Sequence, residues 1–458
     1  MYEIDFKKPN HIYFCGIGGI SMSGLAEILL DAGFKISGSD RAESELTRKL
    51  SANKATVYIG QSAQNVTEDI DVFVYTAAIK PDHPEFAKAQ SLNIPILSRA
   101  QLLGQMMKNY AHPVAISGTH GKTTVTSMVS EILMAANADP TLTVGGVLES
   151  LNGNFRIGHS QMFVTEACEY TNSFLSFFPK YAAILNVEED HLDFFKDIND
   201  IRASFNKFAK LVPDDGVVVI GGDIEGKEEV LKDVKANIIT FGKDSSSDYY
   251  PTEISHTKKG ETVFMVNSPA FGNEEIVLKI PGIHNIYNAL AAIALCDFLN
   301  IDRKVIKDTL AVFGNAKRRF EYKGELNGFT IIDDYAHHPS EIRATLTAVR
   351  DIPHKDVWCV FQPHTYTRTK ALLTDFSKAL SMADKVVLAD IYAARETDNL
   401  GISSETLRDE ISKLGTECYY FPSFKEIENF IKENCAPNDV LITMGAGDVV
   451  NIGEELLK

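Results

Sequence analysis

One stretch limits what this chain can fold into more than any other, because it joins an apolar run to a glycine-rich turn and a helical pattern. Val114–Ile116 indicates a short buried strand, and the apolar residues at 125, 128, 129, 132 and 133 fall on one helix face. The turn between them has the sequence GTHGKTT over residues 118–124. Such a turn is typical of a phosphate-binding loop, since its backbone N–H groups and the helix dipole both attract an anion.

Individual residues of this turn suit a nucleotide and its metal ion. Gly118 and Gly121 let the backbone approach a phosphate, Lys122 can reach the terminal phosphates, and the Thr123 hydroxyl can ligate Mg²⁺. The spacing departs from the usual eight-residue pattern, because Ile116 stands where its first glycine would be. The alternative is an ordinary strand–turn–helix corner, but the coincidence of lysine, hydroxyl and glycines favours the phosphate loop.

A second glycine-rich turn follows a predicted strand at residues 12–15. It has the sequence GIGGIS over residues 16–21, and it precedes a helical pattern and a second strand that ends at Asp40. This layout is typical of a dinucleotide fold, in which the turn binds a pyrophosphate and the acid binds a ribose hydroxyl. Ser21 holds the third glycine position, so a simple packing turn is the alternative. Together the two turns predict two nucleotide-type ligands on separate domains.

Length and composition indicate a globular protein of about three domains, since the chain has 458 residues and ~150 per domain is usual. The net charge of −17 argues against nucleic acid as a partner. The six cysteines form no CxxC pair, which favours reduced thiols in the cytoplasm. We find neither a signal-peptide pattern nor an apolar run of the ~20 residues that a membrane span needs. We therefore expect a cytoplasmic protein with no membrane partner.

Two later strands end in groups that can ligate a metal ion. Phe163–Glu166 ends in a carboxylate, and the strand at 182–187 is followed by the run EEDHLD at 188–193. Because Mg²⁺ prefers oxygen ligands, we predict Thr123 and Glu166 at one Mg²⁺ and His191 at a second. The alternative for residues 188–193 is a solvated acidic turn at the start of a helix.

The rest of the chain continues the α/β pattern after a β-rich stretch at 240–280. Predicted strands cover 329–334, 357–361, 386–390 and 440–444, with helical patterns such as 340–350 and 403–414 between them. This alternation predicts a parallel sheet with polar groups at the carboxyl ends of its strands. Asn285 precedes an alanine-rich helix at 289–299 and either faces a nucleotide or caps the helix. The basic run at 317–321 either reaches ATP phosphates or lies on solvated surface.

Taken together, these motifs resemble the Mur ligase family. The resemblance rests on GIGGISMSGLA at 16–26, GTHGKTT at 118–124, EACEY at 166–170, NVEEDHLD at 186–193, HNIYNALAA at 284–292, RRFE at 318–321, DDYAHHP at 333–339, QPHTYTR at 362–368 and MGAGD at 444–448. It implies an α/β protein of three domains. These are an N-terminal Rossmann-like UDP-sugar domain at 1–108, a central P-loop ATPase-type domain at 109–315, and a C-terminal Rossmann-like domain at 316–458 that contributes to ATP and amino-acid binding.

The resemblance also implies an activity. It is the ATP- and Mg²⁺-dependent joining of an amino acid to the carboxylate of UDP-N-acetylmuramate through an acyl phosphate, in peptidoglycan precursor synthesis. The first glycine motif favours the member that adds L-alanine. The alternative is the related member that attaches murein tripeptide to the same UDP-sugar. A monomer or weak homodimer is expected.

Roles for individual residues follow from the resemblance alone. Lys122 and His191 are the implied catalytic residues, and Thr123, Glu166 and His191 the implied metal ligands. The UDP-sugar residues would be Gly16, Gly18, Gly19, Ser39 and Asp40; the ATP residues Gly118, Thr119, His120, Gly121, Lys122, Thr123, Thr124, Asn285, Arg319 and Asp334; and the amino-acid residues His337 and Arg368. The chain departs from the family pattern at Thr365, where an arginine is often found, at Cys168–Tyr170, which replaces a more acidic run, and at 202–205, which lacks the lysine that sister ligases carbamylate.

Overall fold

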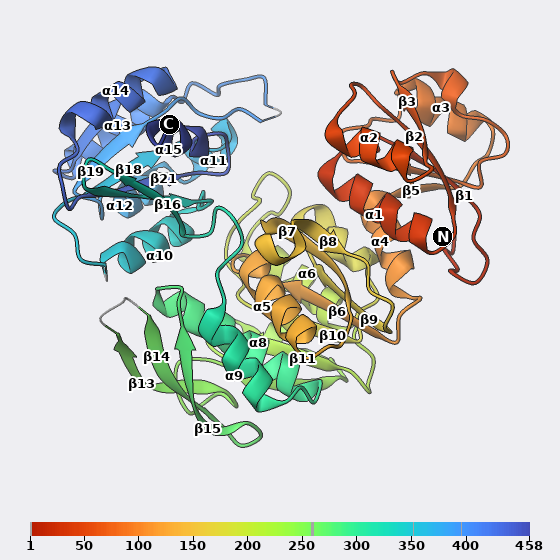
Figure 1. Cartoon of the computed structure of the whole chain (residues 1–458), viewed down its shortest axis with the longest axis horizontal. Coiled ribbons are helices and arrows are strands. Elements are labelled where there is room, and N and C mark those ends of the chain that lie inside the picture. Colours follow the sequence, from red (N-terminus) through yellow and green to blue (C-terminus); the bar gives the residue numbers. More distant parts are fainter. Residues whose placement is uncertain (1, 258–260, 351, 395) are drawn as a thin grey trace. The chain divides into compact units, whose positions relative to one another are not determined.

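A computed structural model describes residues 2–257, 261–350, 352–394 and 396–458. The chain divides into two compact units, Met1–Glu188 with Ile198–Thr240, and Glu189–Asp197 with Phe241–Lys458. Helices and strands alternate through most of both units (Figure 1). The mixed α/β class predicted from the sequence is therefore confirmed.

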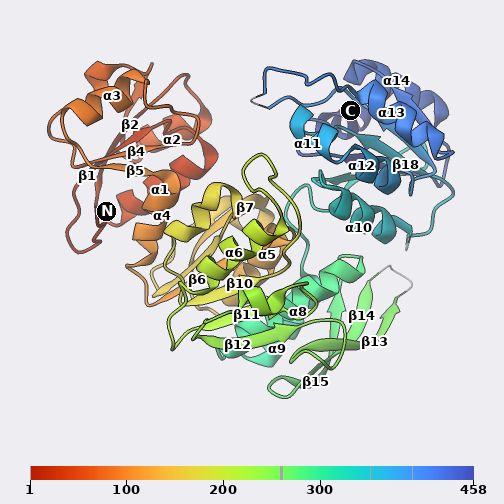
Figure 2. The same cartoon turned by 180° about the vertical axis from the view of Figure 1, so that it is seen from behind.

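The N-terminal part of the first unit is a parallel five-stranded sheet in the order β3-β2-β1-β4-β5. Strands β1, β2, β4 and β5 are labelled in Figure 2. All five residues of β1 are buried, as the apolar run at 12–15 predicts. The glycine turn follows β1 at the point where the strand order reverses, which is where such sheets bind ligands. The strands are β1 (His11–Cys15), β2 (Lys35–Asp40), β3 (Thr56–Ile59), β4 (Val72–Tyr75) and β5 (Ile96–Ser98), and the helices are α1 (Ile20–Asp31), α2 (Glu45–Ala52), α3 (Pro84–Ser91) and α4 (Arg99–Met107).

The first unit also holds a seven-stranded sheet in the order β12-β11-β10-β6-β9-β7-β8. Its central strand, β6, runs parallel to both neighbours, so the loops after β6, β9 and β10 meet at one edge. The elements are β6 (His112–Ser117), α5 (Lys122–Ala135), β7 (Thr141–Leu148), β8 (Gly153–Arg156), β9 (Met162–Glu166), β10 (Tyr181–Ile184), α6 (Ile198–Ala209), β11 (Val217–Gly221), α7 (Lys227–Val230) and β12 (Asn237–Phe241). The phosphate-loop motif thus leaves a central strand of the sheet.

The second unit begins with an antiparallel sheet in the order β13-β14-β15, where the sequence predicts a β-rich stretch. Two helices follow, and the first starts at 283, after Gly282, whose φ of +96° suits glycine. The elements are β13 (Tyr250–His256), β14 (Thr262–Ser268), β15 (Gly272–Leu278), α8 (Ile283–Phe298) and α9 (Arg303–Val312).

The C-terminal sheet has the order β16-β17-β21-β18-β19-β20 and is parallel except for β16. Its elements are β16 (Glu321–Leu326), β17 (Phe329–Asp334), α10 (Pro339–Arg350), β18 (Val357–Phe361), α11 (Tyr366–Ala371), α12 (Leu373–Leu380), β19 (Lys385–Leu388), α13 (Ser404–Lys413), β20 (Glu417–Tyr420), α14 (Phe424–Asn434), β21 (Val440–Met444) and α15 (Val450–Leu456). The predicted strands are confirmed, although β19 ends at Leu388 and not at 390.

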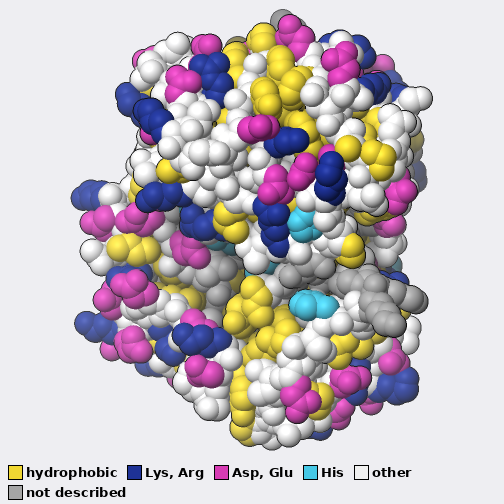
Figure 3. Space-filling model, turned by 90° about the vertical axis from the view of Figure 1, so that its left-hand side faces the viewer, with side chains coloured by type: hydrophobic (Ala, Val, Ile, Leu, Met, Phe, Trp, Pro, Cys, Tyr) yellow, Lys and Arg dark blue, Asp and Glu magenta, His cyan; other side chains and the backbone are white. Residues whose placement is uncertain are grey.

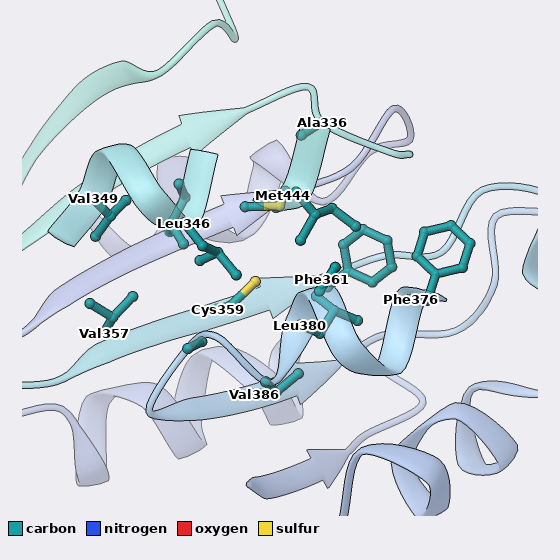
Figure 4. Packing of buried hydrophobic residues seen from close by; sticks show 14 of the residues in the cluster. Ala336, Leu346, Val349, Val357, Cys359, Phe361, Phe376, Leu380, Val386 and Met444 are labelled. Atoms are coloured by element: carbon teal, nitrogen blue, oxygen red, sulfur yellow. The ribbon is translucent and has the colours of Figure 1, made fainter. Parts of the chain in front are cut away.

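Two apolar cores cover the two faces of this sheet. Helices α10, α12 and α13 pack on one face, and α14 and α15 pack on the other. Figure 4 shows the first core, in which the ring of Phe376 lies 5.7 Å from that of Phe361. Because both faces are buried, β18 is apolar along its whole length and β21 is apolar except for Thr443, which is the usual pattern for a covered parallel strand.

Acidic and basic side chains are interspersed on the face drawn in Figure 3. Within the described residues, we find no helix with the length and apolarity that crossing a membrane requires.

Candidate active site

The loop between β6 and α5 needs glycine at two positions. Gly118 has a φ of +143°, and a Cβ there would lie 2.9 Å from the Cβ and 3.0 Å from the backbone nitrogen of Leu185. Gly121 has a φ of +84° and is the N-cap of α5. The first residues of the helix follow Gly121. Their N–H groups have no carbonyl partner within the helix, so they point toward an anion bound at this end. The local geometry is that of a phosphate-binding loop.

Asn186 holds this loop from the end of the neighbouring strand β10. Its side-chain oxygen accepts from the His120 N–H at 2.7 Å, and its side-chain nitrogen donates to the His120 carbonyl at 3.1 Å. The Asn186 carbonyl accepts from the Thr119 N–H at 3.1 Å. The N–H groups of Thr119 and His120 are therefore bonded to Asn186, and those of the first turn of α5 are better placed for phosphate. We did not predict a role for Asn186, although it is the first residue of the NVEEDHLD motif.

The ammonium group of Lys122 lies inside the loop and contacts a second residue that we did not predict, Glu169. Its Nζ is 3.0 Å from Glu169 Oε2, and it also donates to the carbonyls of Gly118 and Thr119. Burial lowers the pKa of Lys122, but the neighbouring Glu169 and Cys168 raise it by more, so that its pKa lies above the ordinary value. Lys122 therefore carries its positive charge at neutral pH.

Glu166 lies at the carboxyl end of β9, beside β6. Its Oε1 accepts from the Gly145 N–H at 2.6 Å, and a Cβ at Gly145 would lie 2.5 Å from Oε2. Glycine at 145 thus leaves room for the carboxylate. With the hydroxyl of Thr123 at the start of α5, Glu166 offers the oxygen ligands that suit Mg²⁺. The donor set of the first unit therefore fits this ion.

His191 belongs to the second unit, where it lies beside Asp190. The His191 N–H donates to Asp190 Oδ1 at 2.7 Å, and its Nε2 is 3.7 Å from Asp190 Oδ2. Thr123 and Glu166, the residues predicted at the first Mg²⁺, belong to the first unit, and the role of His191 at a second metal ion stays a prediction. Most of the run at 188–193 is solvated, as the alternative interpretation predicts, but Asp190 is only 9% exposed.

Arg368 is paired with Asp190 within the second unit. Its Nη2 lies 3.2 Å from Asp190 Oδ1, and its Nη1 lies 3.4 Å from His364 Nδ1. Burial raises the pKa of Asp190, but Arg368 and His191 lower it by more, so that it lies below the ordinary value. Thr365, where the family often has arginine, is the N-cap of α11 and accepts from the Arg368 N–H. The predicted carboxylate-binding arginine thus already has a carboxylate partner.

His337 lies close to His364, with ring centroids 5.8 Å apart. The ring of His364 also stacks on Tyr392, at 5.5 Å. Burial lowers the pKa of both histidines to about 4, so both rings are neutral at pH 7. His337 Nδ1 lies 3.0 Å from the Tyr335 carbonyl. The structure therefore places His337 and Arg368 in one cluster around His364.

Asp334 and Arg319 lie near the start of the C-terminal sheet. The Asp334 carboxylate accepts from the N–H groups of Phe320 and Ala336, at 2.8 and 2.7 Å. Burial raises its pKa to about 6. The guanidinium of Arg319 lies 5.1 Å from the centre of the Tyr335 ring. Asp334 therefore organises the backbone of this motif, and a contact with ATP stays a prediction.

Arg318, a member of the basic run at 317–321, connects two of the motifs. It contacts Asp333 at 3.0 Å and donates to the carbonyls of Gly445 and Gly447. The basic run at 317–321 is therefore not simple solvated surface.

Asn285 lies in the first turn of α8. It donates to the Pro281 carbonyl at 2.6 Å and accepts from Asn288 at 3.1 Å. Its side chain therefore stabilises the helix start, and its role toward ATP stays a prediction.

The first glycine turn is held closed by the residues predicted to bind a nucleotide. The Gly18 N–H donates to Asp40 Oδ2 at 2.8 Å, and the Gly16 N–H donates to the Ser39 carbonyl at 2.8 Å. The Ser39 hydroxyl donates to the buried Glu85 at 2.6 Å. A Cβ at Gly18 would lie 2.8 Å from Asp40. The structure brings these residues together with Gly19, and their contact with a UDP-sugar stays a prediction.

Three family models match successive parts of the chain. They are described as Mur ligase family, catalytic domain (residues 11–111), Mur ligase middle domain (residues 116–296) and Mur ligase, glutamate ligase domain (residues 318–447). This order agrees with the predicted three-domain architecture.

Relatives match the chain over its whole length. The UDP-N-acetylmuramate–L-alanine ligase of Agathobacter rectalis is 57% identical and that of Lachnospira eligens 55%, each over 100% of both chains. Among solved structures, the UDP-N-acetylmuramate-alanine ligase MurC of Thermotoga maritima has a TM-score of 0.80 at 30% identity, over 98% of both chains. A murein peptide ligase of Psychrobacter arcticus has a TM-score of 0.68 at 24% identity, also over 98% of both. The chain has a phosphate-binding loop, a carboxylate suited to a metal ion and matches to three family domains, and it therefore belongs to the Mur ligase family.

Proposed function

We propose that this protein joins L-alanine to the lactyl carboxylate of UDP-N-acetylmuramate, with ATP and Mg²⁺, as the first peptide-forming step of peptidoglycan precursor synthesis. The observation that carries the proposal is the full-length match, at 57% identity, to a relative named for this reaction. The charged Lys122 within a phosphate-binding loop supports the use of ATP.

Activation of the carboxylate explains why the site needs Lys122. A carboxylate does not condense with an amine in water, so ATP first converts it to an acyl phosphate, with ADP as the leaving group. The carboxylate must approach the γ-phosphate, and two like charges ~4 Å apart repel by about 4 kcal/mol at an effective dielectric constant near 20. The ammonium of Lys122 offsets this repulsion and stabilises the charge that develops on the transferred group.

Mg²⁺, held by Thr123 and Glu166 in this proposal, would supply further positive charge at the phosphates. Both groups offer oxygen, and Gly145 leaves the space that the Glu166 carboxylate occupies. His191 is the proposed ligand of a second ion.

The second step is attack of the unprotonated alanine amine on the acyl phosphate. A tetrahedral intermediate forms and expels phosphate. Arg368 is the proposed partner of the alanine carboxylate, because a guanidinium binds a carboxylate through two parallel bonds. Asp190 contacts one of its nitrogens at 3.2 Å, so alanine must share Arg368 with Asp190 or displace it. His337, which is neutral because burial lowers its pKa to about 4, would contact alanine without competing positive charge.

The second candidate function is attachment of murein tripeptide to the same UDP-sugar. Two solved murein peptide ligases are 24% and 28% identical to this chain, whereas curated relatives named for L-alanine reach 57%. We therefore favour L-alanine.

We further propose a monomer or weak homodimer that acts in the cytoplasm, where ATP is available.

A phosphate-release assay tests the proposal. Purified protein with ATP, Mg²⁺ and UDP-N-acetylmuramate is given L-alanine, glycine, L-serine or murein tripeptide in separate reactions. We expect phosphate release that depends on the UDP-sugar and is fastest with L-alanine, and the Lys122→Met variant should lose nearly all of it. Faster release with the tripeptide would favour the second candidate, and no peptide-linked UDP product with any acceptor would refute both.

A further inference from the structure

The contact between Lys122 and Glu169 raises a question that the proposed reaction does not answer. A carboxylate that lies 3.0 Å from the lysine of a phosphate loop adds negative charge where the triphosphate must bind. Glu169 is 2% exposed, so solvent does little to screen this charge. Its position therefore opposes the binding of a phosphate group at Lys122.

The ammonium of Lys122 has no donor left for a phosphate in this arrangement. A lysine ammonium carries three N–H donors. Here they point at the carbonyls of Gly118 and Thr119 and at the carboxylate of Glu169. A contact with the γ-phosphate requires that at least one of these bonds be given up. A phosphate can take the place of the Glu169 carboxylate on Lys122, because both groups are negatively charged.

The backbone that carries Glu169 is anchored by the turn that follows it. It immediately precedes the turn η3 (Tyr170–Ser176), in which Thr171 and Asn172 have φ of 54° and 56°. The turn is anchored by Phe174, which is fully buried and stacks on Phe208 with ring centroids 4.6 Å apart. Lys122, by contrast, reaches Glu169 through four flexible methylene groups. The lysine is therefore the partner that moves.

We infer that Glu169 is a positioning residue that occupies the place of the γ-phosphate on Lys122 until ATP binds. In the empty loop it keeps the ammonium of Lys122 charged and holds it inside the phosphate-binding loop. When ATP binds, Lys122 leaves Glu169 for the γ-phosphate, and the repulsion between Glu169 and the phosphate lowers the affinity for nucleotides that carry one. ADP, which lacks this phosphate, does not require the exchange. This inference rests on the proposed function, in which Lys122 contacts the γ-phosphate.

The test compares an ATP analogue with ADP by isothermal titration calorimetry in the presence of Mg²⁺. The probes are AMP-PNP and ADP, and the variants are Glu169→Gln, Glu169→Asp and Glu131→Gln. Glu131 lies on the same helix, α5, and its side chain contacts Ser150, so its substitution removes one charge without touching Lys122. We expect Glu169→Gln to increase the ratio of AMP-PNP to ADP affinity by about tenfold. Glu169→Asp, which keeps the charge, and Glu131→Gln should leave the ratio within about twofold.

An unchanged or lower ratio in a folded Glu169→Gln variant would overturn the inference. If that variant does not fold, a crystal structure of the unaltered protein with AMP-PNP decides the matter. Lys122 must then lie within hydrogen-bond distance of the γ-phosphate and no longer contact Glu169, and a lysine still on Glu169 refutes the exchange. Absence of any AMP-PNP binding by the unaltered protein would refute the proposed function itself, which separates the two failures.

Discussion

The phosphate loop is predicted to depend on the side chain of Asn186. Of two substitutions at this position, the one that lowers stability more should lower nucleotide affinity less. Asn186→Ala removes both hydrogen bonds to His120, at 2.7 and 3.1 Å. Each such bond contributes about 1 kcal/mol net, so the variant should lose about 2 kcal/mol of stability. The melting temperature of its domain should then fall by roughly 4–8 °C. If ATP binding must restore the native conformation of the loop, the same 2 kcal/mol lowers the affinity for ATP roughly 30-fold.

Asn186→Asp changes the balance because the two side chains have almost the same shape. The carboxylate still accepts from the His120 N–H but can no longer donate to its carbonyl, so about 1 kcal/mol of stability is lost. It also places a negative charge beside the phosphates. At a separation of ~8 Å and a dielectric constant near 20 the repulsion is about 2 kcal/mol. The two effects together lower AMP-PNP affinity roughly 150-fold.

Thermal unfolding and calorimetric AMP-PNP titration of the two variants measure these effects. The matched control is Asn206→Ala, which removes two side-chain hydrogen bonds, to Val230 and Lys232, at 2.9 and 2.8 Å. It should lower the melting temperature by a similar amount and leave AMP-PNP affinity unchanged. The reasoning is refuted if Asn186→Asp binds AMP-PNP as tightly as Asn186→Ala, or if Asn186→Ala binds it as tightly as the unaltered protein.

Three further predictions address other parts of the site. Arg368→Ala should raise the KM for L-alanine at least ~10-fold with a smaller change in kcat, because alanine loses one charged hydrogen-bond partner. Steady-state kinetics with varied alanine concentration measure this. An unchanged KM would place the amino acid elsewhere. Gly118→Ala should cost about 1–3 kcal/mol and weaken AMP-PNP binding, because alanine is strained at a φ of +143°; denaturant unfolding and calorimetry would show it, and wild-type values would argue against a rigid loop. The ring of His337 should titrate near pH 4 in NMR spectra, since burial lowers its pKa from 6.5 to about 4. Because the unfolded ring binds its proton near 6.5, stability should fall as pH drops from about 6.5 to 4, and His337→Gln should flatten that slope; a ring titrating near 6.5 would contradict it.

Features that depend on neighbouring residues were predicted well. The apolar run at 114–116, the glycine turn and the helical spacing after it gave the correct strand, loop and helix, because periodicity and glycine conformations are local properties. The strand that ends in Glu166 was also predicted, whereas the helix predicted at 289–299 starts earlier, at Ile283, and ends at Phe298. For Asn285 the sequence left two interpretations open: its side chain contacts the Pro281 carbonyl and Asn288, the N-cap of the helix is Gly282 without a side-chain hydrogen bond, and a contact with nucleotide stays a prediction.

Contacts between distant residues were predicted poorly. Glu169 and Asn186 both lie in motifs that drew attention, yet neither was connected with the phosphate loop. They lie 47 and 66 positions from the loop residues that they contact. Arg368 was predicted as the partner of an alanine carboxylate, and its existing pair with Asp190, 178 positions away, had no signal in the spacing.

The amino-acid order alone therefore determined where the chain turns, which segments are strands and helices, and that an anion-binding loop follows residue 117. Only the tertiary structure decided which side chains meet there. Strand β6 lies between β10 and β9, so the segments that follow these two strands bring Asn186 and Glu169 to the same loop. The physical reason is that the order of strands in a sheet depends on how whole faces are buried, and local patterns carry little information about that.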